Sequence, residues 1–231
     1  MGKQKTKQVA VEMQEIKLET MKMKIVGTSG IIVHKFSMKA QGEMLSKQVG
    51  VTWPKAPKDP DAQYDMATYW INGDGEQLDG EADLALVYRK KVKEFLAQCT
   101  KRLKRLRALK KPLFGFPSTG LKACAIRGAK SLGLVMADMK GAMFIPREFI
   151  EIVGKRKMRS DMVRISHNTT DVRFRPEFFP WEMTFDVVYN TGTVTADKVV
   201  NMFNAGGFGC GIGEWRPEKG GSHGMFEVAR S

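Results

Sequence analysis

Cysteine is scarce in this sequence. Among its 231 residues only Cys99, Cys124 and Cys210 are cysteines, and their wide spacing leaves no Cys-x-x-Cys pair. This pattern supports neither a disulfide framework nor a thiolate metal site, and it fits a reducing compartment. We therefore expect a cytoplasmic protein that needs no metal ion and no other cofactor.

Long apolar runs are also missing. No segment approaches the roughly 20 consecutive apolar residues of a membrane span. The lysine-rich start, Met1-Gly-Lys-Gln-Lys-Thr-Lys7, has no apolar stretch behind it, so it is not a signal peptide. Met1-Gly2 followed by Thr6 superficially fits a myristoylation pattern, but the lysines favour a disordered basic tail over residues 1–8. We expect no membrane partner.

Histidine occurs at His34, His167 and His223 only. Imidazole is the most common general acid–base group in catalysis, yet a histidine in a strand or loop is more often structural or a phosphate contact. Asp161 and Asp171 lie nearest to basic clusters, and pairing with arginine explains both. We expect a protein that is not an enzyme, with a nuclease that uses one histidine as the alternative.

Acidic residues are outnumbered by basic ones. The sequence has 25 Asp and Glu against 38 Lys and Arg, which gives a formal net charge of +13. Such a balance favours a polyanionic partner, nucleic acid before an anionic membrane. The composition therefore predicts a nucleic-acid-binding protein, with a merely basic soluble protein as the alternative.

The basic excess is concentrated in residues 83–111. Apolar residues recur there at three- and four-residue steps, which predicts an amphipathic helix that Pro112 ends. The other faces carry lysine and arginine, and Glu94 is the one acid after the first turn. This one-sided charge favours a phosphate-binding surface over an ordinary solvated face. A membrane-surface helix is a third possibility, although Phe95 is the only aromatic residue of the segment.

Period-two spacing of apolar residues predicts the first strand, from Val9 to Ile25, which Ile31–Phe36 extends after a glycine break. Ser37 is the expected N-cap of a helix over Met38–Lys47. Leu113 begins a short strand, and Ser118 or Thr119 caps the helix that follows.

Later segments alternate in the same way. Strands are expected at 142–145, 149–153, 161–165 and 172–175, with a basic loop at 154–159. The clearest strand is 181–189, where apolar and polar residues alternate strictly. Thr193 or Thr195 caps a helix through Phe203, Gly206 or Gly207 stops it, and residues 224–229 form a closing strand.

This order of elements predicts an α+β fold with a ferredoxin-like, RRM-like core that carries a long inserted arm. The core comprises residues 9–45 and 112–231. The insertion comprises residues 46–111 and contains the basic amphipathic helix.

A glycine-rich stretch covers Asn204–Val228 and includes one Trp-Arg pair, Trp215 and Arg216. It follows a helix and precedes a strand, so it is neither a Walker A loop nor a dinucleotide fingerprint. Two interpretations remain. The stretch is either a tight helix-to-strand crossover with a packed tryptophan, or a loop whose backbone N–H groups face phosphates while an aromatic ring stacks on a base.

Two of these segments resemble the RAMP superfamily, the RNA-binding subunits of CRISPR effector complexes, and within it the backbone-forming subunits. Residues 116–127, Phe-Pro-Ser-Thr-Gly-Leu-Lys-Ala-Cys-Ala-Ile-Arg, resemble the superfamily segment Pro-Gly-Ser-Ser-Leu-Lys-Gly-Ala-Leu-Arg. The stretch that ends in Gly-Ser-His-Gly-Met-Phe-Glu-Val228 resembles its C-terminal glycine-rich loop. Residues 27–36 and the Trp-Arg-Pro-Glu-Lys sequence also resemble a set of phage proteins.

The resemblance implies an RRM-like protein that binds single-stranded nucleic acid and stacks into filaments. We expect sequence-independent, co-operative binding of single-stranded DNA or RNA by a homo-oligomer in phage or mobile-element metabolism. A RAMP-type endoribonuclease or a CRISPR effector backbone subunit is the alternative. The predicted contact residues are Lys35, Phe36, Lys39, Lys122, Arg127, Arg156, Arg159, Arg173, Arg175, Phe208, Gly209, Gly211, Trp215, Arg216 and Lys219.

Overall fold

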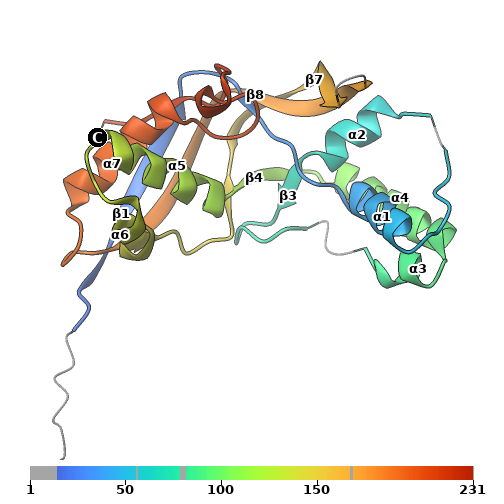
Figure 1. Ribbon diagram of the computed structural model, residues 1–231, viewed down its shortest axis with the longest axis horizontal. Coiled ribbons are helices and arrows are strands. Elements are labelled where there is room, and N and C mark those ends of the chain that lie inside the picture. Colours follow the sequence, from blue (N-terminus) through green and yellow to red (C-terminus); the bar gives the residue numbers. More distant parts are fainter. Residues whose placement is uncertain (1–14, 56, 79–81, 167–168, 231) are drawn as a thin grey trace, which may run out of the picture.

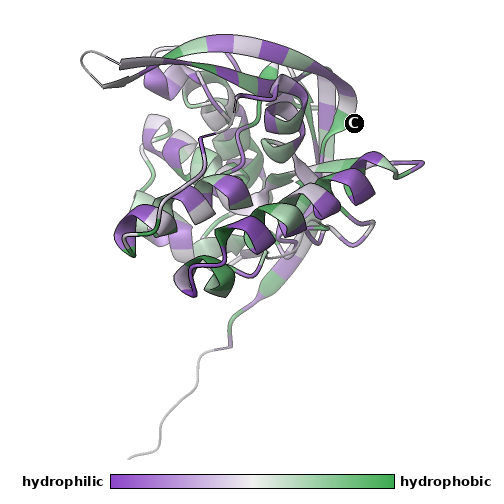
Figure 2. Cartoon of the chain, turned by 90° about the vertical axis from the view of Figure 1, so that its right-hand side faces the viewer, coloured by the Kyte–Doolittle hydropathy of each residue, from purple (hydrophilic) through white to green (hydrophobic). Residues whose placement is uncertain are grey.

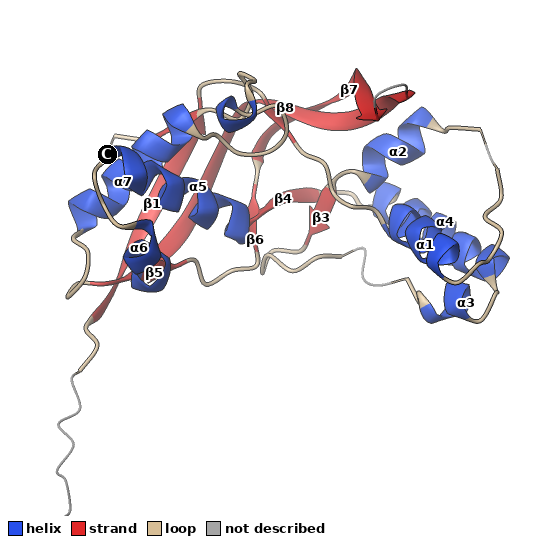
Figure 3. Cartoon of the chain, viewed as in Figure 1, coloured by secondary structure: helices blue, strands red, loops and turns tan. Residues whose placement is uncertain are grey.

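The computed structural model describes residues 15–55, 57–78, 82–166 and 169–230, so the predicted basic tail lies outside the described residues. Figure 1 shows two lobes joined by extended segments, with a two-stranded arm along one side. One lobe is a sheet covered by helices, and the other is built of helices (Figure 3).

The main sheet is antiparallel, and the order of its central strands is β9-β1-β8, with β7 and β5 on the far side of β8. Two helices, α5 and α7, contribute buried residues to the same core as the sheet. In chain order the core reads strand, helix, strand, strand, helix, strand, which confirms the predicted ferredoxin-like α+β fold. The bounds are β1 Leu18–Gly27, α5 Ser118–Ser131, β5 Met143–Phe144, β7 Val153–Ser166, β8 Thr169–Asn190, α7 Ala196–Gly209 and β9 Phe226–Val228.

The first strand and its extension line one edge of β8. β1 pairs Val26 with Glu182, and β2 (Ile31–Ile32) pairs Ile31 with Phe178 further along the same strand. The register of pairing with β8 shifts by one residue between β1 and β2. This is the local irregularity that the glycine break predicted.

Alternation along β1 and β8 decides which face of the sheet is covered. Ile25, Met183 and Val187 are fully buried, whereas Lys24 and Glu182 form a half-exposed ion pair of 2.8 Å on the other face. The strict alternation predicted for 181–189 is confirmed. The helices cover only one face, because the outward residues of these strands are polar.

Close packing of α5 against α7 depends on two glycines. A Cβ at Gly128 would lie 2.5 Å from Gly206 N, and a Cβ at Gly206 would lie 2.4 Å from Cys124 O. The prediction that Gly206 or Gly207 stops the helix was wrong, because α7 continues to Gly209. These glycines serve close approach rather than termination.

Two further local predictions need correction. Ser118 and Thr119 do not cap α5, because its N-cap is Pro117 and no side chain accepts from its first turn. Residues 154–159 are not a loop: they belong to β7, which pairs with β8 along a long two-stranded arm. Part of this arm packs against a helix, and the rest is exposed to solvent. Basic residues are therefore tolerated within the strand.

The helical lobe has its own small core around Val87 and Phe95, against which residues of α1 also pack. The predicted boundary at residue 46 therefore falls inside α1. The N-cap prediction is confirmed, since Ser37 Oγ accepts from Ala40 N at 3.2 Å. The predicted basic helix is divided at Lys90, where φ is 63°. The bounds are α1 Met38–Gln48, α2 Pro60–Met66, α3 Ala85–Tyr88 and α4 Val92–Arg107.

A second antiparallel sheet, in the order β3-β4-β6, leads from the helical lobe to the core. Its middle strand β4 runs directly into α5, so the path of β4 positions the N-terminus of α5. The strands are β3 Tyr69–Ile71, β4 Leu113–Pro117 and β6 Phe149–Glu151, and the short helix α6 (Met136–Ala142) follows α5.

Replacing Gly206 with alanine should destabilise the protein by about 1–3 kcal/mol, because the added methyl group has no room between α5 and α7. Urea unfolding measures this difference. Gly141→Ala is the matched control: Gly141 is also helical but has open space around it, so alanine should stabilise by up to about 1 kcal/mol. Equal effects of the two substitutions would contradict the close contact.

Candidate nucleic-acid interface

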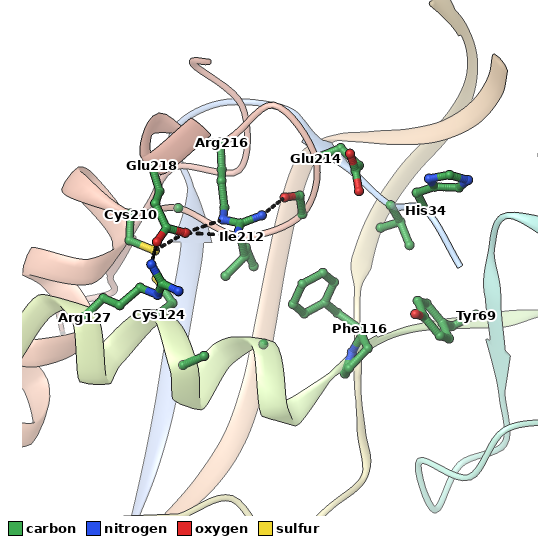
Figure 4. Close-up of a pocket in the computed structure, with 16 residues that line it drawn as sticks. His34, Tyr69, Phe116, Cys124, Arg127, Cys210, Ile212, Glu214, Arg216 and Glu218 are labelled. Carbon is green, nitrogen blue, oxygen red and sulfur yellow. Dashed lines mark hydrogen bonds and ion pairs between the residues drawn. The ribbon is translucent and has the colours of Figure 1, made fainter. Parts of the chain in front are cut away.

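A cavity of about 260 Å³ lies where the start of α5, the end of α7 and the glycine-rich loop come together. Figure 4 shows that the loop forms one wall and α5 the floor, with Phe116 and Tyr69 at the side towards the helical lobe. The cavity therefore joins the two segments that carry the RAMP resemblance, although they are distant in the sequence.

One end of this cavity is a compact charge cluster. Glu218 pairs with Arg127 from α5 and accepts from Arg216 Nε at 3.0 Å. Arg216 also donates to Gly213 O at 3.0 Å (Figure 4). Both predicted arginine contacts thus lie at the cavity, but a shared carboxylate already neutralises half of their charge.

Cys124 and Cys210 meet at the same end, a neighbourhood that the wide sequence spacing could not reveal. Their thiols are hydrogen-bonded to each other, and this bond, supported by the charges of Arg127 and Arg216, lowers the pKa of Cys210 to about 6. The same bond together with burial raises the pKa of Cys124.

The opposite end of the cavity holds His34, Tyr69 and Glu214. Loss of surrounding water lowers the pKa of His34 even though the residue is partly open to solvent, and the charge of Glu214 opposes this shift. Burial raises the pKa of Tyr69. His34 is therefore neutral near pH 7.

The glycine-rich loop forms a compact crossover. Gly211 N donates to Gly206 O at 2.9 Å, Ile212 N to Gly224 O at 2.9 Å and Glu214 N to Ile32 O at 2.9 Å. A Cβ at Gly224 would lie 1.7 Å from Ile212 O, and its φ is 68°. The N–H group of Gly211, a predicted phosphate contact, is therefore engaged within the protein. Gly209, moreover, belongs to α7 and not to the loop.

Arg156 is a structural anchor. It donates to Asp65 at 2.9 Å and to Thr68 at 3.1 Å, and its guanidinium lies 4.3 Å from the centre of the Tyr64 ring. The contacts join the arm to α2 and to Thr68, which follows α2, so Arg156 is poorly placed to contact a phosphate.

A second group of ion pairs lies on the arm beside the loop. Asp161 accepts from Arg159 and from Arg175, each at 2.7 Å, as the sequence predicted for this aspartate. Trp215 is 39% exposed, and Arg159 lies 5.2 Å from the centre of its ring. Arg175 is 1% exposed and cannot contact a ligand directly. The ring of Trp215 already stacks on the guanidinium group of Arg175.

The other predicted contacts are dispersed. Lys35 is buried next to the Tyr69 ring, and burial lowers its pKa to about 8. Arg173 lies 3.9 Å from Asp171. Phe208 is 75% exposed but lines a separate groove between α7 and the β1–β9 edge. Phe36, Lys39, Lys122 and Lys219 are at least partly exposed and do not line the cavity.

The strongest one-sided charge lies on α4. Lys93, Lys101, Lys104 and Arg105 are exposed and lie on the face opposite Phe95 and Leu103, which are buried. Across the described ranges these four cations have no carboxylate within 4.0 Å, whereas Arg107 at the margin pairs with Asp65. We call these four residues the α4 basic face. Figure 2 shows hydrophilic and hydrophobic residues alternating along the helices of this lobe.

The described residues contain no group of three or more His, Cys, Asp or Glu side chains that could hold a metal ion. Nor does any helix of the described part combine the length and apolarity that crossing a membrane requires.

Comparisons with known proteins give little. No family model and no curated protein matches the chain. Among solved structures it is similar to the crystal structure of Cmr6 from Pyrococcus furiosus, with a TM-score of 0.33 and 14% sequence identity over 93% of this chain and 100% of that chain. A similarity this low carries no argument about function.

Replacing Arg156 with lysine should destabilise the protein by about 1–3 kcal/mol, because lysine keeps the charge but loses the planar fork and the ring stacking. Arg164→Lys on the same strand is the control, and since Arg164 is exposed its effect should stay within about 0.5 kcal/mol. Thermal or urea unfolding gives both values. A silent Arg156→Lys substitution combined with weaker oligonucleotide binding would instead make Arg156 a ligand contact.

Proposed function

We propose that this protein binds single-stranded nucleic acid without sequence preference, through phosphate contacts made chiefly by the α4 basic face. The observation that carries the proposal is a set of exposed cations on one side of α4 that form no ion pair within the described part of the chain, while the nearby Glu94 pairs with Lys91. Cations of this kind can release counterions from a polynucleotide, whereas arginines held in internal ion pairs cannot do so without breaking those pairs.

The preference for single strands is supported by the RAMP resemblance of residues 116–127 and of the glycine-rich loop. These two segments border one cavity, and Phe36 is 52% exposed immediately before α1 of the helical lobe. An exposed aromatic ring is a suitable stacking surface for unpaired bases. The phage setting, the filament and the homo-oligomer belong to this proposal and rest on the resemblance alone.

The outward face of the main sheet is not part of the proposed site. Between residues 182 and 190, the outward positions of β8 are Glu182, Thr184, Asp186, Val188 and Asn190. They offer no aromatic ring, and two are acidic; the exposed ring on this face is Phe144 of β5, which pairs with Val188 and is 46% exposed. The acidic outward residues of β8 favour contacts on the helical lobe over contacts on the sheet that many RRM-like proteins use.

The triple substitution Lys101→Gln, Lys104→Gln and Arg105→Gln should weaken binding of a labelled oligonucleotide and flatten its salt dependence. Three lost phosphate contacts should change the slope of log K against log salt by about 2 for a single strand. Fluorescence anisotropy at several salt concentrations measures this, with duplex of the same length as a comparison, and electron microscopy of the same mixtures tests filament formation.

The matched control replaces Lys130, Lys140 and Lys198 with glutamine. These lysines are also exposed helix residues, and the change in net charge is the same. If both triple variants lose affinity equally, net charge and not the α4 basic face governs binding. Tighter binding of duplex than of single strands would refute the single-strand preference.

A second candidate, an endoribonuclease, is favoured by the position of His34 beside Tyr69 and Glu214 in the cavity. We expect the wild-type protein to leave labelled RNA intact, since none of the other described residues that line the cavity is a histidine with which His34 could exchange protons. Gel analysis after prolonged incubation tests this. Fragments that appear with the wild type and disappear with His34→Ala would establish the second candidate.

A further inference from the structure

Two of the three cysteines form a buried pair at the cavity. Cys124 is on α5 and Cys210 is the C-cap residue of α7, and their exposures are 1% and 6%. Their side chains are hydrogen-bonded to each other, and both line the cavity of about 260 Å³. A small solute that enters this cavity would therefore reach both sulfur atoms.

Packing of the backbone holds the two sulfurs together. Gly206 lies one turn before Cys210, and a Cβ added there would be 3.2 Å from Cys124 Sγ. The contact leaves no side chain between the two helices at this level. The pair is therefore part of the helix interface and does not depend on a loop conformation.

The surroundings distinguish the two thiols. In its protonated form Cys210 donates to Glu218 Oε2 at 3.6 Å, and this carboxylate is already paired with Arg127 and bonded to Arg216. Two guanidinium groups therefore pair with one carboxylate, which leaves a net positive charge close to the Cys210 sulfur (Figure 4). An electropositive site of this kind favours a thiolate.

We propose that Cys124 and Cys210 are a redox-active thiol pair: Cys210 reacts with a peroxide that enters the cavity, and Cys124 converts the product into a disulfide. The proposal is independent of nucleic-acid binding. Bulky disulfide reagents are excluded as oxidants in the folded protein, because both sulfurs are buried.

The chemistry balances with hydrogen peroxide as the two-electron oxidant. The Cys210 thiolate attacks one peroxide oxygen, the O–O bond breaks, and the departing hydroxide takes a proton to become water. Cys210 is then a sulfenic acid. The Cys124 sulfur attacks the Cys210 sulfur, the S–O bond breaks, and a second water leaves while the disulfide forms.

The acidities of the two groups agree with these roles. The pKa of Cys210 is lowered to about 6, so its thiolate predominates at pH 7, whereas the pKa of Cys124 is raised and its thiol can donate the hydrogen bond. Cys99 on α4 serves as an internal control for thiol reactivity, because burial raises its pKa.

The experiment treats the reduced wild-type chain with hydrogen peroxide, unfolds it, alkylates the remaining thiols and maps the peptides by mass spectrometry. We expect a Cys124–Cys210 disulfide, with Cys99 alkylated. Disulfide formation should be at least about tenfold faster than oxidation of Cys99 at pH 7. It should be about tenfold slower at pH 5 than at pH 7, because the thiolate fraction rises with pH through the pKa of Cys210.

Variants test the order of the steps. Cys124→Ser should stop at a sulfenic acid on Cys210 that dimedone traps, Cys210→Ser should remove the fast step, and Cys99→Ser should change neither. Because serine in a buried site can impair folding, the wild-type peptide map stands as a test by itself. Oxidation of Cys99 first, cross-linking between chains, or three alkylatable thiols after peroxide treatment would overturn the proposal, whatever the affinity for oligonucleotides.

Discussion

The contact of α5 with α7 sets the geometry on which the rest of the candidate site depends. Gly128 and Gly206 let the two helix backbones meet without intervening side chains. As a result Cys124 and Arg127, one turn apart on α5, reach the end of α7 and the loop that follows it. A wider spacing of the helices would separate the thiols and break the Arg127–Glu218 pair, because both extend from opposite sides of this interface.

The glycines near the C-terminus serve this same packing. Gly207 has no room for a Cβ beside Phe226, and Gly213 has none beside Ile32 O. The loop carries its peptide hydrogen bonds internally and returns the chain to the edge of β1. Glycine density is therefore a requirement of a tight crossover here, and it does not by itself identify a ligand site.

Basic residues divide into two classes with different physical roles. Two arginines of the arm, Arg156 and Arg175, are partly or fully buried and bonded to carboxylates. Removing either partner would leave a buried charge uncompensated, so these residues maintain the architecture. The lysines of α4 extend from an exposed face, and their charge remains available to solvent and to a polyanion.

Several features could be predicted from the sequence because they depend on local pattern. The alternation of 181–189, the Ser37 cap, the closing strand and the ferredoxin-like order of elements are all confirmed, and the amphipathic pattern of residues 83–111 correctly separated a buried stripe from a basic face. In each case the period of the side chains or the geometry of a cap acts within a few residues.

What the sequence by itself determined is the order of elements and the excess of positive charge. The tertiary structure alone decided which cations are neutralised, which glycines are packed and which cysteines meet. Arg156 contacts Asp65, Gly128 contacts Gly206, and Cys124 contacts Cys210 only after the chain has folded. Burial and pairing depend on groups that are distant in the chain, so no local pattern of residues can encode them.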